Sequence, residues 1–243
     1  MAISIDTVYQ RVLALANKEQ RGYITPQEFN LFANQAQMAI YETYFYEKEK
    51  ALMESSVKGT DTESDIVYMI NEKLKPFYED SVGAGSGINL AADLYRLENV
   101  YLAVGNSGTQ LCQEITEKEY SLMMNTGSDL TPNLLNPTTD RPVYRRVTNA
   151  VINCYSSSNT TAATSGVTYS YYKSPTDCAW GYTVVNYEAL YDATQTTDFQ
   201  LHPSEESSLV IKLLELAGIT LNKPGLIQVA NQEEAEMLQM KNS

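Results

Sequence analysis

The spacing of apolar residues changes twice along the chain, and this constrains the fold more than any other feature of the sequence. Up to about residue 80, and again from about residue 200, apolar residues recur at steps of three and four, as on one face of an α-helix. Between these regions, after the stretch SVGAGSG, short segments rich in Val, Ile, Thr and Tyr are bounded by Gly, Pro, Asn or Ser. The pattern predicts an α+β fold: N-terminal and C-terminal helices form a bundle, and the centre forms an antiparallel β-sheet or a small sandwich.

This change of spacing also predicts how the chain divides. We assign residues 1–80 and 200–243 to a helical core and residues 81–199 to a mainly β region. Within the β region, the segment TEKEYSLMM predicts a single short helix. The polar, Pro-rich stretch over 125–142 predicts a long exposed loop.

The stretch over 17–28, NKEQRGYITPQE, has the frame of a calcium-binding loop but not its ligands. Arg21 places a permanent cation at a position where calcium needs an oxygen ligand. The end of the stretch is typical of a helix start, with Thr25 as N-cap, Pro26 at the first helical position and Glu28 reaching back to the cap. We therefore expect a helix from Pro26 to about residue 52, after a first helix over 5–16, and no calcium site.

A third, shorter helix is predicted before Pro76, which cannot continue it. Its apolar residues fall in one stripe, which a helix normally buries against a neighbour. The stripe consists of Ile66, Met69, Ile70 and Leu74.

The C-terminal region predicts a helix that starts at Pro203 and stops at Gly218, then another from near Pro224. The tail carries three apolar residues with little else in the chain to bury them: Met237, Leu238 and Met240. We expect these residues to form a partner interface, with the tail folding when it docks.

Charge and cysteine content narrow the class of protein. Thirty acidic residues and 17 basic ones give a net charge of −13, which argues against a surface that binds a phosphate backbone. It does not argue against a surface along which DNA moves without binding. The three cysteines lack the spacing of a zinc site or a disulfide framework, so we expect a reducing compartment. No segment approaches about 18 unbroken apolar residues, so no membrane association is expected.

The single histidine, His202, is the only one available for histidine-dependent catalysis. The sequence HPSEE permits an acid/base cluster of His202, Glu205 and Glu206, or a capped helix start whose carboxylates oppose the helix dipole. We favour the cap, because His202 and Ser204 are too close in sequence to form a triad. We expect no catalytic, metal or cofactor site and no enzymatic activity.

Tyrosine is abundant, with 18 in the chain. In the segment TYSYY, alternation places Tyr169 and Tyr171 on one side of a strand and Tyr172 on the other. We therefore expect at least one of these rings to be exposed or covered by a partner, and assign all three to a partner interface.

Several phrases together resemble a known family. They are VYQRVLALANKEQRGYITPQEFNLFANQAQ at the start, ADLYRL, CAWGYTVVN, and FQLHPSEESSLVIKLLELAGI near the end. They resemble the head-to-tail connector ring proteins, of the adaptor or gatekeeper type, of crAss-like and related short-tailed bacteriophages. The resemblance spans nearly the whole chain, but these phrases are not catalytic motifs.

The resemblance implies a structural virion protein. Such a protein forms a homo-oligomeric ring of about twelve copies below the portal. The ring contacts the portal and other connector and tail proteins. It extends the channel through which genomic DNA passes without sequence-specific binding. It implies a location at the head-to-tail junction of the virion, and the host cytoplasm during assembly. The alternative is a receptor- or glycan-binding tail module, motivated by the tyrosine-rich sheet.

Overall fold

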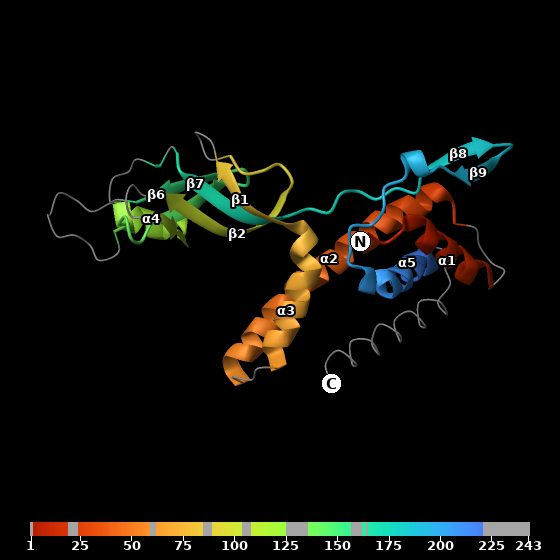
Figure 1. The fold of residues 1–243 in the computed structure, drawn as a ribbon, viewed down its shortest axis with the longest axis horizontal. Helices are drawn as coiled ribbons and strands as arrows, with labels where there is room; N and C mark the ends of the chain where they lie inside the picture. Colours follow the sequence, from red (N-terminus) through yellow and green to blue (C-terminus); the bar gives the residue numbers. More distant parts are fainter. Residues whose placement is uncertain are drawn as a thin grey trace. The chain divides into compact units, whose positions relative to one another are not determined.

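The computed structural model describes residues 2–18, 24–58, 62–84, 89–103, 108–124, 136–156, 162–163 and 165–220 (Figure 1). The fold is α+β, as predicted. The chain forms two compact units, a helical unit of Met1–Pro76 with Pro175–Ser243 and a strand unit of Phe77–Ser174. The sequence-based division placed 81–199 in the β region, whereas residues 175–199 belong to the helical unit.

The helical unit contains four α-helices among its described residues. Their bounds are α1 Ile5–Lys18, α2 Pro26–Lys58, α3 Thr62–Leu74 and α5 Glu206–Thr220. α3 packs on α2, and α5 packs on both α1 and α2. The unit also holds the strands β8, Tyr182–Val185, and β9, Glu188–Tyr191, and short 3-10 helices at Ala193–Gln195 and Pro203–Glu205.

The predicted start of α2 is confirmed. Thr25 Oγ1 accepts a bond from Glu28 N at 3.3 Å, and Glu28 Oε2 accepts from Thr25 N at 3.0 Å. These reciprocal bonds satisfy two backbone donors that a helix start otherwise leaves unpaired. The bonds from Thr25 lower the pKa of the Glu28 carboxyl. The turn that contains Arg21 lies outside the described residues.

The helical core follows the predicted apolar stripes. On α1, Ile5, Val8 and Val12 are buried, and Leu209 and Leu213 are buried on α5. The helix predicted from Pro203 begins as a 3-10 turn and continues as α5 to Thr220, two residues beyond the expected stop. The second C-terminal helix, predicted from near Pro224, lies outside the described residues.

In its described residues, the strand unit contains β1 to β7 and one α-helix. Their bounds are β1 Tyr78–Ala84, β2 Leu94–Ala103, β3 Thr109–Leu111, β4 Gln113–Glu114, α4 Glu117–Met124, β5 Val143–Thr148, β6 Val151–Tyr155 and β7 Val167–Lys173. One antiparallel sheet has the order β1-β7-β2-β3 and a second has the order β4-β5-β6. Only the pairing of β4 with β5 is parallel among the described strands.

The two sheets of the strand unit share a core, so of the two predicted arrangements the sandwich is the one observed. Val100 and Val167 of the first sheet pack in one buried cluster with Ile152 and Cys154 of the second. Of the predicted loop over 125–142, the structure describes residues 136–142, where Thr138 to Arg141 are exposed.

None of the helices in the described ranges is both long enough and apolar enough to span a membrane.

Candidate functional site

A row of amide side chains on α2 holds the extended segment 176–180. Asn34 Oδ1 accepts from Cys178 N at 2.8 Å, and Asn34 Nδ2 donates to Cys178 O at 3.1 Å. Asn30 bonds the N–H and the carbonyl of Trp180 in the same manner, at 2.8 and 3.3 Å. Gln37 Nε2 donates to Thr176 O at 2.9 Å. Helix side chains therefore satisfy backbone groups of Thr176, Cys178 and Trp180, while the backbone of Ala179 between them pairs with that of Thr197.

The match between these two elements has a simple geometric cause. Four residues of an α-helix rise about 6 Å, and two residues of an extended chain advance about 6.6 Å. Asn30 and Asn34 are four apart and meet Trp180 and Cys178, which are two apart. This bonding is the physical reason that the segment belongs to the helical unit despite its β-like sequence.

Trp180 joins this segment to the hairpin that follows. Its indole Nε1 donates to Asp6 Oδ1 at 2.9 Å, and its ring centroid lies 4.5 Å from that of Tyr9 on α1. The same ring stacks on Tyr182 at 5.9 Å and contacts Tyr191 at 5.8 Å. The base of the β8–β9 hairpin is thus fixed to α1 and α2.

Gly181 and Asp192 close the base of the hairpin. Asp192 N donates to Gly181 O at 2.9 Å, and a Cβ on Gly181 would lie 2.7 Å from Asp192 O and 2.5 Å from the backbone carbon of Gln195. Only glycine fits there. The Asp192 carboxylate accepts bonds from the side chain and backbone N–H of Thr194, which lower its pKa.

The β8–β9 hairpin exposes apolar side chains on both of its faces. Tyr182 pairs with Tyr191 and Val184 with Ala189 on one face, and Thr183 with Leu190 and Val185 with Glu188 on the other. We call its five exposed large apolar residues the hairpin surface: Val184, Val185, Tyr187, Leu190 and Tyr191. Because a two-stranded hairpin is marginally stable alone in water, uncovered apolar faces on both sides are typical of an element that a partner covers.

The tip of this hairpin has a strained backbone. Asn186 and Tyr187 have φ of 53° and 69°, the left-handed region that a tight hairpin turn requires. Asparagine tolerates this region, but an aromatic residue there costs on the order of 1–2 kcal/mol. Tyr187 is fully exposed, so no contact in the described chain offsets that cost. Strain of this kind, kept at an exposed aromatic residue, is typical of a functional position.

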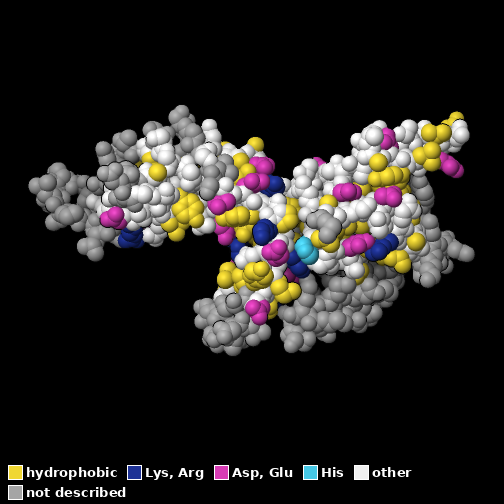
Figure 2. Space-filling model, in the orientation of Figure 1, with side chains coloured by type: hydrophobic (Ala, Val, Ile, Leu, Met, Phe, Trp, Pro, Cys, Tyr) yellow, Lys and Arg dark blue, Asp and Glu magenta, His cyan; other side chains and the backbone are white. Residues whose placement is uncertain are grey.

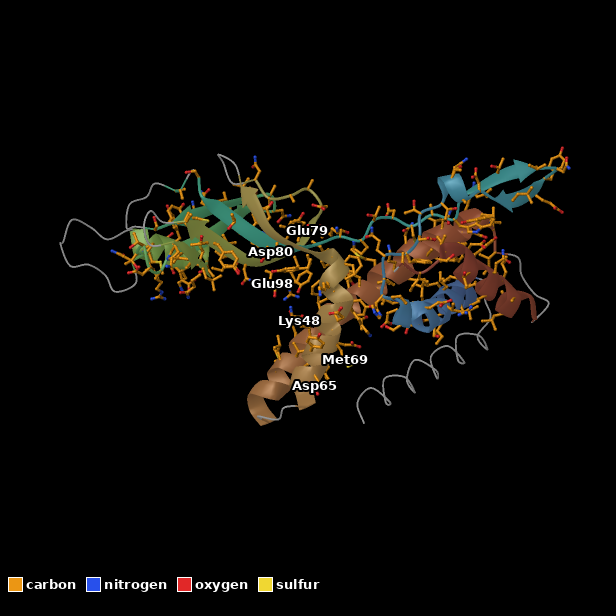
Figure 3. The ribbon with its side chains drawn as sticks, in the orientation of Figure 1. Lys48, Asp65, Met69, Glu79, Asp80 and Glu98 are labelled. Atoms are coloured by element: carbon orange, nitrogen blue, oxygen red, sulfur yellow. The ribbon has the colours of Figure 1, made fainter. Side chains whose placement is uncertain are left out.

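Further exposed apolar residues lie on α2 and α3. The predicted α3 stripe is only half buried: Ile70 and Leu74 face the core, whereas Ile66 and Met69 are 40% and 61% exposed. The predicted helix is present as α3, and its apolar stripe is buried only in part. Tyr46 and Met53 of α2 and Tyr68 of α3 are exposed as well. Figure 2 shows apolar side chains gathered over α3 and at the β8–β9 hairpin, and Figure 3 labels Met69 on α3.

The tyrosines assigned to a partner interface lie inside the strand unit. Tyr169, Tyr171 and Tyr172 are each at most 5% exposed, so the expectation of an exposed ring is wrong. Alternation does place Tyr172 opposite the other two, but β7 is a central strand between β1 and β2, and both its faces are covered. Tyr172 packs on Tyr78, with ring centroids 5.3 Å apart.

The other assigned interface residues, Met237, Leu238 and Met240, lie outside the described residues. The hairpin surface was not predicted from the sequence. The segment YTVVNYEALY carried the signal, because two short runs rich in Val, Tyr and Leu flank an Asn-initiated two-residue turn.

The HPSEE segment forms a capped helix start. His202 Nδ1 accepts from Ser204 N at 3.3 Å, in agreement with the predicted cap. Glu205, however, is buried and forms an ion pair with Lys73 of α3, while Glu206 pairs with Arg11 at 2.8 Å. The carboxylates are therefore engaged in ion pairs between elements, which the sequence did not predict.

Tyr44 borders the pair formed by Lys73 and Glu205. Lys73 Nζ lies 5.5 Å from the centre of the Tyr44 ring. Burial, with a smaller contribution from the charge of Glu205, raises the pKa of Tyr44 well above its ordinary value. The tyrosine therefore stays neutral beside the ion pair.

Within the described residues, no group of three or more His, Cys, Asp or Glu side chains is arranged to hold a metal ion. Glu79 and Asp80 on β1 and Glu98 on β2, labelled in Figure 3, form no such group. Glu79 instead pairs with Lys173 Nζ at 2.8 Å. The exposed hairpin is thus the strongest candidate site in the described chain.

No protein-family model matches this chain, and no curated protein matches it either.

Proposed function

We propose that this chain is a structural, non-enzymatic virion protein that forms a ring at the head-to-tail junction of a short-tailed bacteriophage. In this role about twelve copies sit below the portal, link it to connector and tail proteins, and extend the channel for DNA. The family resemblance of the sequence supplies the biological setting. Its location is the virion, with assembly in the host cytoplasm.

The observation that carries an assembly role is the β8–β9 hairpin. Its base is fixed by Trp180, its two faces are apolar and exposed, and its tip presents Tyr187 in a strained conformation. Exposed aromatic residues on a rigid support are typical anchors of protein interfaces, because little conformational entropy is lost when they dock. The hairpin therefore favours a function that depends on binding another protein.

The charge of the chain supports a channel through which DNA moves. A net charge of −13 repels the phosphate backbone, so a ring of such subunits would not retain DNA as a basic surface would. The corresponding proposal is that DNA passes through the channel without sequence-specific binding.

The alternative of a receptor- or glycan-binding tail module loses the observation that motivated it. It depended on exposed tyrosines of the TYSYY segment, and Tyr169, Tyr171 and Tyr172 are buried. The hairpin tyrosines Tyr187 and Tyr191 remain exposed, so this alternative now depends on the hairpin alone.

The test is the mass of the purified protein by light scattering, alone and mixed with the portal protein of the same phage. The proposal expects a closed assembly of high order that contains portal and this chain in fixed proportion. A stable trimer that ignores the portal would overturn it and favour the receptor-binding alternative.

A further inference from the structure

Both edges of the β8–β9 hairpin are open. The hairpin is a sheet of two strands, and within the part of the chain that the structure describes neither strand pairs with a third one. Figure 1 shows the two strands projecting beyond the helices α1 and α2. An open strand edge is a template on which another strand can pair, so each copy offers two such edges.

The register of the hairpin defines which backbone groups lie on these edges. Val185 and Glu188 flank the two-residue turn, and the residues that flank such a turn form a hydrogen-bonded pair. Bonded and non-bonded pairs alternate along an antiparallel ladder, so Val184 and Ala189 form a non-bonded pair. The N–H and C=O groups of Val184 therefore point away from β9, and those of Ala189 point away from β8. The side chain of Val184 is 62% exposed, so this edge is accessible.

We propose that the outer edge of β9 in one copy pairs with the outer edge of β8 in the next copy, so that the hairpins of neighbouring copies form one continuous antiparallel sheet. The inference rests on the proposed ring function and names its subunit contact. Contact between two different edges is heterologous, so its repetition closes into a ring when the rotation per subunit allows. Because each strand has four residues, a single contact is weak and ring closure stabilises it.

A second copy fits these edges by symmetry. β8 and β9 run in opposite directions, so in a ring whose hairpins are aligned along its axis, β9 of one copy also runs opposite to β8 of the next. When neighbouring hairpins stand at the same height, Ala189 of one copy lies opposite Val184 of the next copy. The outward groups of these two residues then form a hydrogen-bonded pair, which continues the alternation within the hairpin.

Charge and edge pairing both favour this arrangement. Residues 182–191 contain one charged side chain, that of Glu188, in a chain with a net charge of −13. Two copies therefore repel each other less at their hairpins than across an average part of their surfaces. A symmetric pairing of two β9 edges would leave both β8 edges open, whereas the head-to-tail pairing covers both edges of every copy in a closed ring.

Proline substitutions block one edge at a time. Ala189→Pro removes the outward N–H of β9 and Val184→Pro removes that of β8, and neither N–H belongs to the bonded pairs between the two strands. Ala189→Ser and Val184→Thr are the matched controls, because they change the same side chains and keep the N–H. Trp180, the single tryptophan of the chain, stacks on Tyr182, so its fluorescence reports whether the hairpin stays folded.

Light scattering measures the association of each variant, alone and with portal. A189P and V184P should each associate at least about tenfold more weakly than the parent, because an edge bond is lost and its partner group is left unpaired. A189S and V184T should associate as the parent does. Without portal, an equimolar mixture of A189P and V184P should form a pair of chains and nothing larger, because only the open β8 edge of A189P can meet the open β9 edge of V184P.

Hydrogen exchange gives a second measurement on the assembled parent, with portal where assembly requires it. The N–H groups of Val184 and Ala189 should exchange at least about tenfold more slowly than in the unassembled chain, because both become hydrogen-bonded. Unchanged exchange at both groups would overturn the edge contact.

The outcomes separate this contact from its alternatives and from the ring function. A V184P chain that still dimerises alone would overturn the inference in favour of a symmetric contact between β9 edges, and an A189P chain that does so would favour β8 edges. If the parent forms a high-order assembly and both proline variants form it equally well, the edge contact is wrong and the ring function stands. If the parent forms no such assembly with or without portal, both proposals are wrong.

Discussion

Asn34 pairs with the backbone of Cys178 as a neighbouring strand would, accepting from its N–H at 2.8 Å and donating to its carbonyl at 3.1 Å. The side chain of one helical residue thus satisfies two backbone groups of a segment 144 positions away in sequence. This pairing fixes the segment that leads to the β8–β9 hairpin, and it can be tested directly.

Asn34→Ala should lower the free energy of unfolding by about 1–3 kcal/mol, because it leaves two partly buried backbone groups without partners. Urea denaturation measures the change. Thr43→Ala is the control: Thr43 is exposed on the same helix and its hydroxyl donates to Ala39 O, so the change should stay within about 0.5 kcal/mol. Equal effects of the two substitutions would contradict this account of the segment.

The ion pair of Lys73 with Glu205 gives a second prediction. The Glu205 side chain is 5% exposed and that of Lys73 is 16% exposed. Lys73→Met should lower the free energy of unfolding by about 3–5 kcal/mol, because a buried carboxylate then loses its ion pair with a lysine. The double variant K73M/E205L should recover most of this loss in the same urea measurement.

Lys75→Met is the matched control for that prediction. Lys75 is 74% exposed and lies 3.9 Å from Glu72, so its removal should cost under about 1 kcal/mol. If K75M costs as much as K73M, burial does not explain the effect at Lys73.

The structural features that depend only on the spacing of nearby residues were predicted correctly from the sequence. The start of α2 at Pro26 follows from the cap formed by Thr25 and Glu28, and the α+β class follows from the change of period. It could not show that segment 176–180 bonds to α2 side chains, because those contacts join residues more than 130 positions apart.

The candidate site could not be predicted from the spacing of nearby residues either. Alternation placed Tyr171 and Tyr172 on opposite sides of a strand, but only the topology shows that β7 is central and covered on both faces. Conversely, Ile66 and Met69 belong to a regular apolar stripe, and only the tertiary packing shows that they stay exposed.

Alkaline pH should destabilise the strand unit through Tyr171. Burial raises the pKa of this residue to about 12, assisted by the bond that its hydroxyl donates to Asp93 Oδ1 at 3.0 Å. Since the folded state holds the proton more tightly, the contribution of Tyr171 is complete below pH 10 and is lost as the pH rises from 10 to 12, at about 1.4 kcal/mol per pH unit. Urea unfolding across this pH range measures the loss.

The control for this prediction is Tyr171→Phe. It should lower stability at neutral pH by about 1 kcal/mol, because the bond to Asp93 is lost. Above pH 10 its stability should fall less steeply than that of the parent chain. Identical slopes for the two proteins would show that Tyr171 is not responsible.

Salt should strengthen self-association of the chain. Raising the ionic strength from 0.1 to 1 M shortens the Debye length from about 10 to about 3 Å, which screens repulsion between copies that each carry a charge of −13. Apolar contact at the hairpin surface is not weakened by this screening. Light scattering over a salt series should show a rising mean mass; a falling one would indicate that the contact depends on ion pairs.

Tyr187→Gly should separate stability from assembly. Glycine adopts the left-handed region without steric cost, so the variant should gain about 0.5–1 kcal/mol in free energy of unfolding after the added freedom of its unfolded chain is counted. It should also associate at least about tenfold more weakly, because the exposed aromatic anchor is lost. Thermal unfolding and light scattering on the same sample measure the two effects. Leu31→Ala, which removes another exposed apolar side chain outside the hairpin surface, should leave association unchanged. A Y187G variant that associates as well as the parent would show that the strained tyrosine has no role in assembly.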